Sequence, residues 1–105
     1  MIREPFKDKN ILLELLEKAI EAGASEMEIE YKDGCEQVFA VGQGIGIGIA
    51  SVDSKSREAR LLRQELYSIG KKKKMIRLAG REYALRVRIF DSFGEDAFHV
   101  TITRS

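Results

Sequence analysis

Apolar positions spaced three and four residues apart predict two helices in this chain. In residues 11–22 they are interspersed with glutamate and lysine, which is the pattern of a helix with one buried face. Gly23 suits the left-handed residue after that helix, and Gly70 the end of the second one. The candidate capping residues are Asp8 or Asn10 for the first helix and Asp53, Ser54 or Ser56 for the second. The predicted buried seam of the second helix consists of Ala59, Leu62, Leu66 and Ile69.

Strict alternation predicts the first pair of strands. Over residues 26–31, three glutamates alternate with three apolar side chains. The Asp33-Gly34 dipeptide that follows is the strongest short signal for a two-residue hairpin turn. Such a turn sets two facing pairs on one side of the sheet, Ile29 with Val38 and Met27 with Ala40.

The other face of this hairpin carries Phe39 and Val41 beside the glutamates, and we expect something to cover this apolar strip. Four glycines then follow at every second position, which predicts a strand with all of them on one bare face. A flat packing surface or a bulged turn is favoured here over a phosphate cradle, because both glycine-rich phosphate motifs are missing. The glycines are Gly42, Gly44, Gly46 and Gly48.

Three more strands are predicted in the last third of the chain. A short one over residues 75–78 turns at Ala79-Gly80, and two longer alternating segments form a hairpin across residues 91–95. The elements together predict one α+β domain over residues 1–105. Its expected architecture is an antiparallel sheet with two helices packed on one face, in the order helix, two or three strands, helix, three strands.

Composition and charge exclude several classes of protein. A chain of 105 residues that is 44% apolar can bury one core and is not a disordered chain. Its only cysteine, Cys35, cannot form an intramolecular disulfide, and no apolar run approaches the roughly 18 residues of a membrane span. Residues 1–6 lack the apolar centre of a signal peptide, so a cytoplasmic location is expected. The net charge is +1, but acidic residues crowd the first third and basic residues the rest.

Candidates for catalysis and metal binding are few. Cys35 and His99 are the only pair that resembles a nucleophile and a base, and no positive charge beside Cys35 favours its thiolate. One cysteine and one histidine cannot form a dedicated zinc site. Glu26, Glu28 and Glu30 are interpreted as a solvated face or a docking strip for a basic partner, in preference to a catalytic carboxylate pair. The sequence therefore predicts a non-enzyme with no catalytic residue, metal or cofactor.

Basic residues make up the candidate binding site. The lysine run at residues 71–74 follows a predicted helix end, where it interacts favourably with the helix dipole and keeps a loop solvated. Together with nearby arginines it is alternatively a phosphate patch, and aromatic side chains on the same sheet face would suit single-stranded nucleic acid. The candidate binding residues are Phe39, Lys71, Lys72, Lys73, Lys74, Arg77, Arg86 and Arg88.

Three short segments carry a resemblance to a known family. Residues 23–30 read Gly-Ala-Ser-Glu-Met-Glu-Ile-Glu, residues 80–88 read Gly-Arg-Glu-Tyr-Ala-Leu-Arg-Val-Arg, and residues 94–100 read Gly-Glu-Asp-Ala-Phe-His-Val. These segments resemble strands of the PAS-like N-terminal (N2-type) domain of type II secretion and type IV pilus assembly motor ATPases. Glu26 and Glu28 depart from that pattern, since they stand where the family has Asp and His. The chain contains no Walker motif, which excludes ATP hydrolysis.

The resemblance implies a PAS-like fold and a cytoplasmic domain that contacts an ATPase ring. By motif position, it implies that Arg86 and Arg88 approach the nucleotide of that ring. We therefore predict a non-enzymatic protein-interaction or regulatory module that docks on a motor ATPase or on a second copy of itself. A small RNA- or DNA-binding protein that uses the basic C-terminal half is the alternative, and a PAS-type sensor of a small ligand is a third possibility.

Overall fold

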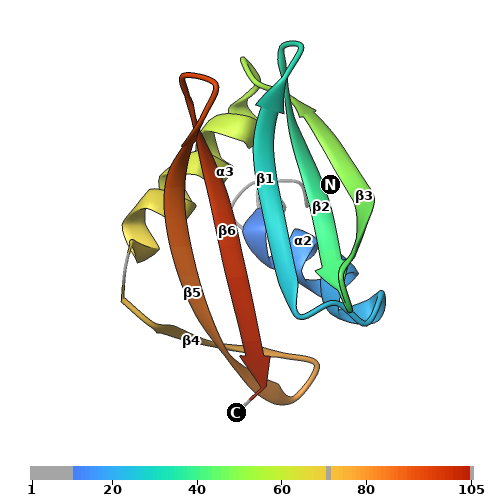
Figure 1. Ribbon diagram of the computed structural model, residues 1–105. Coiled ribbons are helices and arrows are strands. Elements are labelled where there is room, and N and C mark those ends of the chain that lie inside the picture. The colour runs from blue at the N-terminus through green and yellow to red at the C-terminus, as the bar shows by residue number, and fades with distance from the viewer. Residues whose placement is uncertain (1–10, 71, 105) are drawn as a thin grey trace, which may run out of the picture.

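One antiparallel sheet forms the body of the molecule, and both helices lie on the same face of it (Figure 1). The computed structural model describes residues 11–70 and 72–104. The helices are α2 (Ile11–Glu21) and α3 (Arg57–Ile69). The strands are β1 (Glu26–Lys32), β2 (Cys35–Gly42), β3 (Ile45–Asp53), β4 (Lys74–Leu78), β5 (Arg81–Ser92) and β6 (Glu95–Arg104).

The predicted PAS-like fold is wrong, although the described elements follow one another along the chain as helix, three strands, helix and three strands. The described residues form a single sheet of six strands in the order β3-β2-β1-β6-β5-β4, in which every neighbouring pair is antiparallel. The central pairing of β1 with β6 places Met27 opposite Val100 and joins two meanders of three strands each. Local turns set the pairs within each meander, whereas no local signal sets this long-range pair.

The third strand follows a turn that the sequence analysis did not identify. Gln43 and Gly44 adopt φ angles of 53° and 79°, which is the geometry of a two-residue hairpin turn. The predicted strand with four glycines on one face is therefore wrong. Gly42 ends β2, and Gly44 lies in the turn. Only Gly46 and Gly48 lie in β3, where they share one face of the sheet.

The close neighbour of the two β3 glycines belongs to the same sheet. A Cβ atom at Gly48 would meet the ring of Phe39 at 3.9 Å, and one at Gly46 would meet Cγ2 of Val41 at 3.8 Å. Phe39 and Val41 both lie on β2 and are half-buried. Packing within the sheet therefore covers part of the apolar strip on this face.

The first hairpin has the predicted register, with Ile29 opposite Val38 and Met27 opposite Ala40. These four side chains are buried beneath the helices together with the predicted seam of α3. The largest fully buried side chains are Phe98, Leu16, Met27, Ile29, Leu62, Leu66, Leu85, Val38 and Val100. The alternation of the strands thus decides which face of the sheet becomes the core.

Capping residues mark the start of α3 and the ends of both helices. The N–H of Ala59 donates to Oγ of Ser56 at 3.1 Å, so Ser56 caps α3. Gly70 ends α3 with φ 58°, and Gly23 follows α2 with φ 80°, as predicted. The candidate caps of α2 lie outside the described residues; they are Asp8 and Asn10.

Candidate interaction surface

The outer edge of β5 is only half paired. β4 pairs with residues 81–85 of β5, and beyond Leu85 the strand has only β6 as a neighbour within the described part of the chain. Figure 1 shows β4 leaving β5 at the lower end of the sheet, so that the upper part of β5 becomes an edge. The backbone N–H and C=O groups along such an edge are available to a further strand.

A groove of about 540 Å³ follows this free edge. It combines apolar side chains from the core side of β5 with basic side chains from the opposite side. Gly70, at the end of α3, forms one of its walls. The remaining lining residues are Arg86, Val87, Arg88, Ile89, His99 and Thr101.

The two arginines of the groove differ in their side-chain contacts. Arg88 lies within 3.4 Å of Nδ1 of His99, and its guanidinium stands 5.1 Å from the centre of the Phe90 ring. His99 in turn contacts Glu26, with 2.9 Å between Nε2 and Oε1. Arg86 makes no side-chain hydrogen bond or ion pair to residues 11–70 or 72–104, so its guanidinium keeps its donors for a ligand.

The open face of the sheet, which no described helix covers, carries both signs of charge. Glu26, Glu28 and Glu30 lie there on β1, and β6 alone separates them from the arginines of β5. Two strand spacings amount to about 10 Å. That distance exceeds the Debye length of about 8 Å at physiological salt, so the repulsion between these glutamates and an anion at the arginines is largely screened.

The predicted binding residues lie in different parts of the structure. Only Arg86 and Arg88 lie together at the groove. Lys74 and Arg77, on β4, form ion pairs with glutamates: Lys74 with Glu65 at 3.3 Å and Arg77 with Glu82 at 3.9 Å.

The other predicted residues lie apart from the groove. Lys72 and Lys73 are exposed in the connection between α3 and β4, and Lys71 lies outside the described residues. Phe39 lies on β2, with β1 and β6 between it and the arginines. The predicted set therefore does not form one continuous patch.

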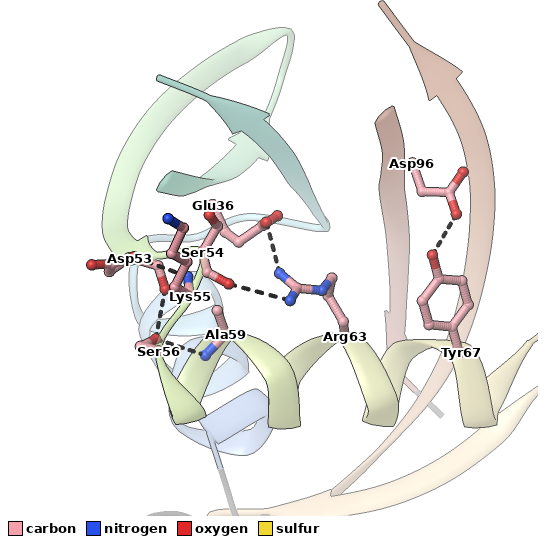
Figure 2. Close-up of polar contacts among 9 residues, drawn as sticks. All are labelled: Glu36, Asp53, Ser54, Lys55, Ser56, Ala59, Arg63, Tyr67 and Asp96. Atoms are coloured by element: carbon pink, nitrogen blue, oxygen red, sulfur yellow. Dashed lines mark hydrogen bonds and ion pairs between the residues drawn. The ribbon is translucent and has the colours of Figure 1, made fainter. Parts of the chain in front are cut away.

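A second polar region lies where α3 crosses the sheet (Figure 2). Arg63 donates from Nη1 to Oε2 of Glu36 at 2.8 Å and from Nη2 to the carbonyl oxygen of Ser54 at 3.3 Å. Further along α3, the hydroxyl of Tyr67 donates to Oδ2 of Asp96. This cleft of about 310 Å³ is lined by Tyr31, Glu36, Ser54, Arg63, Tyr67, Glu95 and Asp96.

No sequence pattern had predicted this cleft. Glu36 is 3% exposed because it lies on the core side of β2, in the same alternation as Val38 and Ala40. A charged residue at a core position was the available signal. Its carboxylate is paired, and the ring of Tyr67 packs edge-on against Phe98 at 5.2 Å between ring centroids. We interpret the cleft as the attachment of α3 to the sheet.

Cys35 and His99 are not brought together. Cys35 lies opposite Lys32, whereas His99 lies opposite Glu28, four residues away along β1. The offset along β1 alone is about 13 Å, and the two residues lie on strands on opposite sides of β1, which is too far for proton transfer between them. No group of three potential metal ligands occurs among the described residues.

Comparisons with known proteins identify no relative: no family model matches the chain, and no curated protein matches it. The resemblance to motor ATPase domains therefore stays a prediction. No helix in the described part of the chain is long and apolar enough to cross a membrane.

Proposed function

We propose that this protein is a non-enzymatic protein-interaction module that binds an extended, acidic segment of a partner protein. The segment adds to the free edge of β5 as a further strand. The observation that carries the proposal is the unpaired edge beyond Leu85, which runs along the groove that contains Arg86 and Arg88. Backbone hydrogen bonds to the edge supply affinity in this mode of recognition, and alternate side chains supply specificity.

The alternation of β5 defines the chemistry of the added segment. Arg86 and Arg88 point to the open face, whereas Val87 and Ile89 belong to the face of the helices. A neighbouring strand places its side chains on the same two faces in turn. Acidic residues alternating with apolar residues therefore match this edge.

Nucleic acid fits this surface less well than an acidic peptide does. A nucleic acid cannot pair with the backbone edge of β5 as an added strand can. Lys74 and Arg77, which could extend a phosphate-binding patch, are engaged with glutamates. Among protein partners, a secretion or pilus motor ATPase is one to test by co-purification. A cytoplasmic location is part of this proposal, in keeping with the single cysteine.

Fluorescence anisotropy with a labelled peptide of alternating glutamate and valine tests the proposal. We expect saturable binding that weakens as salt is added. Arg86→Ala should weaken it about tenfold, because one charge-assisted hydrogen bond is lost. Arg81→Ala is the matched control, since Arg81 lies on the same strand but is already paired with Leu78 of β4; it should bind as the wild type does.

A second peptide separates strand addition from simple charge attraction. It has the same sequence but carries a methyl group on every backbone nitrogen, so it keeps its charges and neither of its edges can donate to β5. We expect it not to bind. Equal binding of both peptides would overturn the proposal. Displacement of the first peptide by a single-stranded oligonucleotide, with affinity falling linearly in log salt, would instead support the nucleic-acid alternative.

A further inference from the structure

The opposite end of the sheet has a free edge of a different chemical character. β3 pairs with β2 on one side and with no described strand on the other. Ile45 and Ile47 point to the side of the helices, where they are 64% and 52% exposed. They stand beside a hollow of about 290 Å³ next to Gly23, Ala40 and Gly42.

This edge lacks the charges that usually protect a strand from pairing. No charged residue occurs from residue 43 to residue 52. Its one protective feature is the β-bulge opposite Val38 and Phe39, which leaves the regular stretch from Ile45 to Gly48 unaffected. An exposed apolar edge without charges is a site for pairing with another strand.

We propose that β3 pairs with β3 of a second copy of this chain, antiparallel and around a two-fold axis at Gly46. In this register, Ile45 of each copy lies opposite Ile47 of the other. The sequence around Gly46 is Ile-Gly-Ile, so the two-fold contact, in which each residue meets the same partner in both copies, pairs apolar side chains only with apolar side chains. The four isoleucines cover one another beside the two hollows.

Charge explains why a second copy suits β3 and not β5. Two β3 edges bring no charges together, whereas two antiparallel β5 edges would bring Arg86 and Arg88 of both copies close to each other. The β3 contact is short, so we expect a weak dimer that forms as concentration rises. It lies at the other end of the sheet and leaves each β5 edge open, and it does not rest on the proposed peptide binding.

Sedimentation velocity over a series of concentrations tests the dimer. The wild-type protein should change from monomer to dimer, and Ile47→Lys should remain a monomer because two lysines meet the opposing isoleucines. Met75→Lys is the matched control, since Met75 is 48% exposed and lies on another edge strand, β4. It should dimerise as the wild type does. A wild type that stays monomeric, or an Ile47→Lys variant that dimerises equally, would overturn the proposal.

Disulfide cross-linking tests the register and does not depend on a lysine substitution. Cys35→Ser removes the native thiol, and Gly46→Cys then places one cysteine of each copy at the axis. The new Cβ fits, because it meets only Cγ2 of Val41 at 3.8 Å. Mild oxidation should give a covalent dimer that a reductant reverses.

Gly48→Cys is the control for this register. In the proposed dimer the two residues at position 48 lie four residues apart along the paired strands, about 13 Å. That separation exceeds the roughly 7 Å limit between Cα atoms for a disulfide. Equal cross-linking at both positions, or none at Gly46→Cys, would contradict the two-fold contact.

Discussion

Arg63 on α3 binds Glu36 on β2, and Glu36 is the only charged side chain that is buried among the described residues. The two residues are 27 positions apart in the sequence. A carboxylate on the core side of a sheet is unfavourable unless a partner compensates for its lost hydration. The position of Arg63 on the helix is therefore what allows β2 to carry Glu36 there.

Arg63→Ala should destabilise the protein strongly, since it leaves the Glu36 carboxylate buried and unpaired. We expect a loss of about 3 kcal/mol in the free energy of unfolding, the lower end of the range for a broken buried pair. Denaturant unfolding at neutral pH measures it. Arg77→Ala is the control, because the Arg77–Glu82 pair is exposed, and its loss should be below about 1 kcal/mol. Equal losses in both variants would contradict this account of Glu36.

Tyr67 should lose its proton at a higher pH than a free tyrosine does. The hydrogen bond to Asp96 raises the pKa of Tyr67, burial and the charge of Asp96 add to this, and Arg63 opposes it. Because the pKa is higher in the folded state, the protonated hydroxyl stabilises the fold below the pKa of a free tyrosine, about 10. That contribution is lost as the pH rises through the folded-state pKa.

Absorbance of the tyrosinate during an alkaline titration measures the shift. The wild type should show a late step that is absent in Tyr67→Phe. Asp96→Asn should move this step to lower pH, because it removes the negative charge beside the hydroxyl. A late step that survives in Tyr67→Phe would assign it to another tyrosine.

Local patterns predicted the pairs that short turns determine. Asp33-Gly34 fixed the register that places Ile29 opposite Val38, because a two-residue turn leaves no choice of pairing. Gln43-Gly44 makes a turn of the same kind, but glutamine lacks the strong turn preference of asparagine or aspartate. The third strand was therefore ambiguous, and the glycines were assigned to one face.

The long-range contacts were not predicted from the sequence. The β1–β6 pair and the Glu36–Arg63 contact join residues that no turn or periodicity relates. For the candidate site, alternation correctly placed Arg86 on the polar side of β5. The free edge beside it depends on where β4 stops, which is a property of the assembled sheet.

Replacing Phe93 by asparagine should stabilise the protein. It lies at the tip of the β5–β6 hairpin, fully exposed, with φ 52°. The left-handed region is unfavourable for a bulky residue by about 1–2 kcal/mol, and asparagine adopts it more readily. Thermal unfolding should show a higher midpoint for Phe93→Asn than for Phe93→Ala, which removes the ring without favouring this backbone. Equal midpoints would show that the turn is unstrained.

Leu85 and Arg86 are neighbours on β5, but their substitutions should affect different properties. Leu85→Ala should lower stability, and Arg86→Ala should weaken peptide binding. Leu85 is 1% exposed in the core, so Leu85→Ala should lower the free energy of unfolding by about 2–5 kcal/mol through the cavity it leaves. Arg86 is exposed on the other face, and Arg86→Ala should change stability by less than about 0.5 kcal/mol. Thermal melts of both variants, with peptide binding measured below the melting range, check this. A large fall in the melting temperature of Arg86→Ala would mean that its guanidinium stabilises the fold, and its effect on binding would then no longer report a contact with the partner.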